Sequence, residues 1–147
     1  PPGSGAIEKV FTDYFASKKI PSVPTAFNGR SDYGPFIAEG INVPAGGLFT
    51  GAEGIKTEEQ AKLFGGQAGV AYDINYHAKG DTYSNLNFTA FEVNAKASAH
   101  AIATFVQSTK VVDDEKKAAG LATRQVAPGP YDNAPAQGKH LCVGDLS

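Results

Sequence analysis

The chain has 147 residues, of which 41% are hydrophobic and 19% are charged, enough for one compact domain with a hydrophobic core. Its 13 basic and 15 acidic residues are scattered and give a formal net charge of -2, so the composition argues against nucleic acid as a partner. No apolar run approaches the roughly 20 residues of a membrane-spanning helix, so we expect no membrane partner either.

Two residue counts bear on the origin of the chain. The sequence contains no methionine and one cysteine. Without a methionine, residue 1 is not a translation start, so we expect a processed product or a fragment of a longer protein. Cys142 has no second cysteine to pair with, and no histidine or aspartate is arranged beside it as a nucleophile requires, so it leaves the compartment undecided.

The N-terminal segment has the pattern of an amphipathic helix. Apolar residues from Ile7 to Phe15 fall at helical spacing, Ser4 stands where a cap is expected, and the sequence IPSVP ends the pattern. A short strand at 25–27 is predicted next. It leads into a loop that contains glycine and then into a short helix at 31–39.

Residues 45–50, AGGLFT, read as a buried strand that runs into a glycine-rich loop. Loops at strand ends are where α/β proteins usually carry their sites. Thr57, followed by two glutamates and Gln60, is a capping-box pattern that predicts a helix at 57–64. The change between extended and helical patterns is typical of an α/β fold.

A long amphipathic helix is predicted at 87–107, where it should close the core. Its apolar side consists of Phe88, Phe91, Ala95, Ala101, Ile102, Phe105 and Val106. After Val112 the sequence becomes rich in proline, glycine and charge. We therefore predict a domain at 1–110 and a mostly disordered tail at 111–147.

The stretch NYHAKGDTYSNLN places His77 in a polar loop. A histidine in such a loop is most often a surface or hydrogen-bonding residue, and a metal ligand is the competing interpretation. The sequence has no H-E-x-x-H motif, so any further ligands must come from distant positions. The triplet NFT at Asn87 permits glycosylation of a secreted or vacuolar protein, and it also arises by chance.

Several motifs occur together in one unbroken order: FNGRSDYGPFIAEGINVPAGGLFTGAEGIKTEEQAKLFGG, AYDINYHAKGDTYSNLN and ASAHAI. This run, from about Gly3 to Val106, resembles the C-terminal portion of a secreted zinc aminopeptidase of peptidase family M28, of the fungal and Streptomyces type. The resemblance implies a partial, helix-flanked, mixed but mostly parallel sheet of the zinc-exopeptidase kind. It also implies two zinc ions in the complete enzyme, removal of apolar, leucine-type N-terminal residues from peptides, and a secreted or vacuolar location.

The resemblance assigns roles to five residues. His77 matches the family's last zinc ligand, and Tyr76 matches a residue that donates a hydrogen bond to the oxyanion; core packing is the alternative for Tyr76. Arg30 matches an arginine near the substrate backbone, with a salt bridge to the nearby Asp32 as the alternative. Phe49 matches an apolar wall of the substrate pocket, although burial in the core is a competing role. Gly29 would let the backbone approach the peptide.

The resemblance also implies what the chain lacks. The family's other zinc ligands and the glutamate that serves as general base precede the matching part, so His77 is at most one ligand and the isolated chain is expected to be inactive. The missing N-terminal half of the catalytic domain is the expected partner, beside a peptide substrate. Relatives often bracket the Tyr-His pair with a short disulfide, whereas this chain has Asn75 and Gly80 at those places.

The acids within the matching part are read as structural: Asp32, Glu53, Asp73 and Asp81. Asp81 is expected to orient the His77 loop by hydrogen bonding. His100 is read as a packing or helix-surface residue, and His140 as part of the tail. Two other functions stay open, namely a receptor-like or binding-type relative without catalysis, and a stable fragment with an interaction role of its own.

Overall fold

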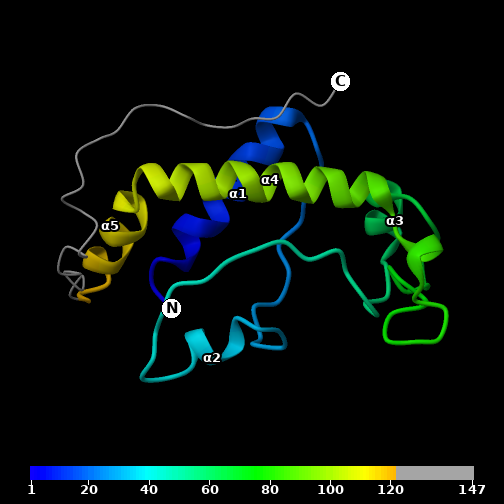
Figure 1. Ribbon diagram of the computed structural model, residues 1–147, viewed down its shortest axis with the longest axis horizontal. Helices are drawn as coiled ribbons and strands as arrows, with labels where there is room; N and C mark the ends of the chain where they lie inside the picture. The colour runs from blue at the N-terminus through cyan, green and yellow to red at the C-terminus, as the bar shows by residue number, and fades with distance from the viewer. Residues whose placement is uncertain (122–147) are drawn as a thin grey trace.

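The computed structural model describes residues 1–121, in which the regular elements are helices (Figure 1). In chain order they are α1 (Ser4–Lys18), α2 (Gly34–Ile37), α3 (Glu58–Phe64), the 3-10 helix η1 (Tyr83–Asn85), α4 (Phe88–Gln107) and α5 (Lys110–Ala118). Most of the predicted tail, with His140 and Cys142, lies outside the described residues. Within residues 1–121, no helix is both long and apolar enough to cross a membrane.

The expected α/β fold with a helix-flanked, mostly parallel sheet is wrong for the described residues, because no strand ladder forms among them. Their β-pairing is an isolated antiparallel bridge between Ile55 and Ala71. Residues 25–27 and 45–50, which we predicted as strands, have no regular secondary structure. A helix makes its backbone hydrogen bonds within its own segment, whereas a strand exists only where a second strand lies beside it. The apolar pattern did not reveal whether such a partner is present.

The predicted N-terminal helix is confirmed as α1, but Ser4 does not cap it. Gly3 occupies the N-cap position with a φ of 99°. The carboxylate of Glu115, from α5, accepts hydrogen bonds from the backbone N–H groups of Gly3 (2.8 Å), Gly5 (3.3 Å) and Ala6 (2.5 Å). These are N–H groups that a helix leaves without internal partners, so a distant carboxylate replaces the local cap that the sequence suggested.

The segment 43–50 runs along α1 without pairing as a strand. The backbone N–H of Ala45 donates to the Ser4 hydroxyl at 3.2 Å. A side chain at Gly46 would start 2.5 Å from Cγ2 of Ile7, so only glycine lets the backbone pass this close to the helix. Leu48 packs against the core from the same segment.

The core lies where α1 and α4 cross (Figure 1). Phe11 and Phe15 of α1 are buried against Ala97 and Ala101 of α4, and Ala97 is 0% exposed. The small alanine side chains let the phenylalanine rings come close to the backbone of α4. The prediction that the helix at 87–107 closes the core is therefore confirmed, through its alanines.

The larger apolar residues predicted for the buried side of α4 are mostly exposed. Phe91 is 68% exposed, Ile102 65% and Val106 82%. Ile102 and Val106 instead line an apolar groove of about 640 Å³ between α1, residues 44–47 and α4. Within the described residues, α4 thus uses one side for the core and presents a second apolar side to solvent.

The capping box predicted for the third helix is confirmed in both directions. Gln60 N donates to the Thr57 hydroxyl at 3.2 Å, and Thr57 N donates to Oε1 of Gln60 at 2.9 Å. Farther along the chain, α5 packs against α1. Its residues 110–118 include the first part of the segment predicted as a disordered tail, so that part is helical.

Candidate functional site

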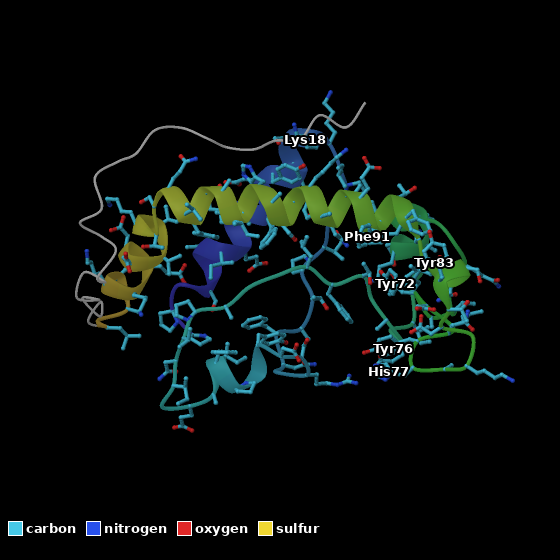
Figure 2. The ribbon with its side chains drawn as sticks, in the orientation of Figure 1. Lys18, Tyr72, Tyr76, His77, Tyr83 and Phe91 are labelled. Atoms are coloured by element: carbon cyan, nitrogen blue, oxygen red, sulfur yellow. The ribbon has the colours of Figure 1, made fainter. Side chains whose placement is uncertain are left out.

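The Tyr76–His77 pair stands at the exposed end of the loop between α3 and α4 (Figure 2). Tyr76 is 42% exposed, His77 is also exposed, and their ring centroids lie 4.1 Å apart in an edge-on arrangement. His77 has a φ of 53°, in the left-handed region that few residues other than glycine adopt. Both side chains are exposed, so core packing of Tyr76 is excluded in the described structure.

Arg30 forms an ion pair, with Glu53 rather than with Asp32. Its Nη2 donates to Oε1 of Glu53 at 2.8 Å. The hydrogen bond and the charge of Glu53 raise the pKa of Arg30, while the pKa of Glu53 is lowered by its own backbone N–H and then by Arg30. The two side chains are 74% and 51% exposed, so the pair orients the guanidinium without burying it.

The aromatic pair has a small electrostatic influence on this ion pair. Tyr76 contributes to the raised pKa of Arg30, and His77 contributes to the lowered pKa of Glu53. Contacts join Arg30 to Glu53 and Tyr76 to His77, so three separate segments supply two exposed pairs of side chains. We call these four residues the site cluster: Arg30, Glu53, Tyr76 and His77. Glu53 is the member that sequence reasoning missed as a site residue. Its place in the glycine-rich loop directly after the predicted pocket residue was the available signal.

The two other residues predicted to contact substrate flank Arg30 and Glu53 in the sequence. Gly29 has a φ of 77° and donates its N–H to the Tyr33 hydroxyl at 3.1 Å. Phe49 is 61% exposed, which excludes burial in the core of residues 1–121. An exposed phenylalanine near the start of the glycine-rich loop is available as an apolar contact.

A complete zinc centre is not formed by residues 1–121. No group of three or more His, Cys, Asp or Glu side chains in this range is placed to hold a metal ion. Zinc takes about three protein ligands in catalytic sites and four in structural ones. His77 is therefore at most one of the ligands that a zinc ion requires. A zinc ion at this position needs ligands beyond those that the described residues supply.

Two further residues singled out in the sequence have structural contacts. The Oδ1 atom of Asn87 accepts a hydrogen bond from Ala90 N at 3.0 Å and caps α4. A glycan attaches to the other side-chain atom, the Nδ2, so glycosylation at the exposed Asn87 stays a prediction. His100 stacks on Tyr14 with ring centroids 4.9 Å apart, as expected for a packing residue on a helix.

The apolar groove contains no member of the site cluster. Its walls include Ile7, Phe11, Ile102 and Phe105, all from α1 and α4. Ser98 is the polar residue of its lining, which includes no acid, base or histidine for acid–base chemistry. The polar site cluster and the apolar groove are therefore two distinct surfaces.

Comparison with known proteins gives two results. Residues 3–102 match the sequence model of Peptidase family M28. The chain is also 65% identical over 108 residues to the "Probable leucine aminopeptidase 2" of Aspergillus fumigatus, and 59% identical over 110 residues to the "Leucine aminopeptidase 2" of Trichophyton rubrum. These alignments cover 74% and 75% of the chain, respectively.

The alignments cover a much smaller share of the relatives. They span 21% of the Aspergillus fumigatus protein and 22% of the Trichophyton rubrum protein. A third alignment, to the "probable leucine aminopeptidase 2" of Aspergillus oryzae, is 49% identical over 142 residues and covers 96% of the chain but 28% of that protein. The chain thus spans between a fifth and a third of the length of these relatives.

Proposed function

The chain belongs to peptidase family M28, and from this premise we propose that it is one part of a dizinc aminopeptidase that removes apolar, leucine-type N-terminal residues from peptides. The single observation that supports the proposal most is the site cluster. Arg30 pairs with Glu53 across 23 positions, the rings of the consecutive residues Tyr76 and His77 contact each other, and all four side chains are exposed. The names of the similar fungal proteins favour leucine as the residue removed.

Each member of the site cluster has a proposed role. The His77 imidazole is one ligand of a zinc ion that other parts of the complete enzyme also bind. The Tyr76 hydroxyl donates a hydrogen bond to the carbonyl oxygen of the scissile peptide bond, where negative charge develops. Arg30 donates to a backbone carbonyl or product carboxylate of the substrate, and Glu53 keeps its guanidinium oriented.

Phe49 and Gly29 are proposed to complete the substrate contacts. A side chain that is 61% exposed loses solvent-accessible apolar area when a leucine side chain packs on it, and this favours an apolar N-terminal residue. Gly29 has no side chain to obstruct the peptide beside Arg30. The preferred N-terminal residue is therefore proposed to depend on Phe49.

The isolated chain is proposed to lack peptidase activity, because residues 1–121 supply no complete set of metal ligands. The proposed partner is the missing N-terminal half of the catalytic domain. Its docking surface would be the apolar groove together with the exposed apolar side of α4, because an apolar surface of this kind on a single domain usually marks an interface. We further propose a secreted protein that carries a glycan at Asn87.

A chimera tests the proposed function directly. The 108 matching residues of the Aspergillus fumigatus relative are replaced by those of this chain, and zinc content and leucine-anilide hydrolysis are measured. We expect an active chimera with two zinc ions, loss of zinc and activity in His77→Ala, and a lower kcat with retained zinc in Tyr76→Phe. His100→Ala, on the surface of α4, is the matched control and should keep both properties. A folded chimera without zinc or activity would contradict the proposal and favour a binding-type relative.

A further inference from the structure

The loop that carries Tyr76 and His77 is half-buried where its two ends meet and exposed between them. Between residues 74 and 86, Asn75 and Asn85 are half-buried and every other residue is exposed. Asp73, at the start of the loop, is also half-buried. Three polar side chains are therefore partly shielded from solvent where the two ends of the loop meet.

These three side chains form a closed hydrogen-bond network. Oδ1 of Asp73 accepts from the backbone N–H of Asn75 at 2.8 Å and from Nδ2 of Asn85 at 3.0 Å. Nδ2 of Asn75 donates to Oδ1 of Asn85 at 2.6 Å. Each member contacts the other two, and the bonds connect positions up to 12 residues apart. We call this network, Asp73–Asn75–Asn85, the loop clamp.

Gly80 provides the space that the loop clamp needs. A Cβ atom built at Gly80 would lie 2.1 Å from Oδ1 and 2.7 Å from Cγ of Asn75. A side chain at this position would have to displace the Asn75 amide from its bond to Asn85. The backbone of Gly80 itself does not require glycine, because its φ lies outside the left-handed region.

The conformation of His77 needs an external restraint. Ala78 N donates to the Asn75 carbonyl oxygen at 2.8 Å, so His77 is the third residue of a tight turn, where type II turns have a positive φ. A residue other than glycine adopts such a φ at a free-energy cost, and it stays there only where the surrounding structure holds it. The turn begins at Asn75, whose backbone N–H and side chain are both held by the loop clamp.

We propose that Asp73, Asn75 and Asn85 are positioning residues, which hold the Tyr76–His77 turn in the conformation that presents both side chains. The importance of this positioning for peptide hydrolysis rests on the function proposed above, but the effect on the turn does not. Asp81, which the sequence suggested for this task, donates its backbone N–H to Ala78 at 3.0 Å. Its carboxylate has no hydrogen-bond partner among the described residues, so Asp73 takes the role instead.

The test uses NMR of the 147-residue chain, without zinc. The intraresidue NOE between the amide proton and Hα of His77 is strong at positive φ, and amide exchange at Asn75 reports on its bond to Asp73. In Asp73→Ala and Asn85→Ala we expect the NOE to weaken and the Asn75 exchange rate to rise about tenfold. Asp73→Asn keeps an acceptor oxygen and should restore part of both signals. Asp81→Ala, an acid of the same loop outside the clamp, should change neither, and unchanged α1 and α4 amides verify folding.

A double-mutant cycle makes the test specific to the clamp. Gly80→Ala should reproduce the effect of Asn85→Ala, because its Cβ displaces the Asn75 amide. In an Asn75→Ala background the same substitution should have no further effect, because the obstructing amide is gone. A preserved His77 NOE in both Asp73→Ala and Asn85→Ala, or equal effects of Gly80→Ala in the two backgrounds, would overturn the proposal. Neither result depends on zinc, so the proposed function can fail in the chimera while the clamp holds, or the reverse.

Discussion

Replacement of Glu115 by alanine is expected to destabilise the chain more than an ordinary surface substitution. The half-buried carboxylate accepts three backbone N–H bonds at the N-terminus of α1, between 2.5 and 3.3 Å. Loss of a helix cap costs roughly 0.5–2 kcal/mol, and a charge at the helix dipole adds about 0.3–1 kcal/mol. Water can replace part of these bonds at an accessible site. We therefore expect the free energy of unfolding to fall by about 1–2 kcal/mol.

The sign of the pH dependence follows from the lowered pKa of Glu115, whose first cause is the hydrogen bond from Gly3. A carboxyl with a depressed pKa in the folded state stabilises the fold above its ordinary pKa, and this contribution is lost as the pH falls through the folded-state value. The difference between wild type and Glu115→Ala should thus be largest at neutral pH. It should shrink once the pH falls below the ordinary pKa of a glutamate.

Thermal unfolding followed by circular dichroism measures both effects. At pH 7 we expect the Tm of Glu115→Ala to fall by about 4–8 °C for a domain of this size. Asp114→Ala is the matched control, because the neighbouring Asp114 pairs with Lys110 within α5 and is exposed. A Tm within about 1 °C of wild type at pH 7, or the same Tm difference at low pH as at neutral pH, would refute the capping role.

Three further predictions follow from particular contacts. Ala97→Leu should lower the free energy of unfolding by about 1–3 kcal/mol in urea titrations, because Ala97 is 0% exposed in the core. Ala95→Leu, on the exposed side of α4, is the control and should be nearly neutral; equal effects would argue against the core assignment. In the active chimera, Glu53→Gln should raise KM for leucine-anilide several-fold with a smaller change in kcat, because the neutral amide orients Arg30 less well. An unchanged KM would contradict the orienting role of Glu53. Expression in a secreting fungal host should give a glycan that an endoglycosidase removes, with a mobility shift absent in Asn87→Gln; the absence of any shift in the native chain would refute the glycosylation prediction.

The exposed apolar side of α4 also bears on the stability of the chain. Five apolar residues are buried within residues 1–121, namely Phe11, Phe15, Ala52, Ala97 and Ala101. Large side chains such as Phe91 and Val106 are more than half exposed. Apolar burial is the main stabilising contribution to folding, and this core is small. A partner that covers the groove and the exposed apolar side of α4 would bury more apolar area and stabilise the chain, in agreement with the proposed partner.

The sequence by itself determined the features whose hydrogen bonds are local. The long helix that became α4, the capping box of Thr57 and Gln60, and the helix that became α1 were all predicted from residues a few positions apart. These elements can be predicted locally because each makes most of its backbone hydrogen bonds within its own segment. The order of local motifs also indicated membership of family M28, and the family match confirmed it.

Only the tertiary structure decided the contacts between distant residues. Glu115 caps α1 across 112 residues, and Arg30 pairs with Glu53 across 23 residues rather than with the nearby Asp32. The predicted sheet failed for the same reason, since apolar runs at 25–27 and 45–50 become strands only beside a partner, and residues 1–121 provide none. Such contacts depend on the path of the whole chain, because a side chain binds whichever complementary group the fold brings within about 3 Å.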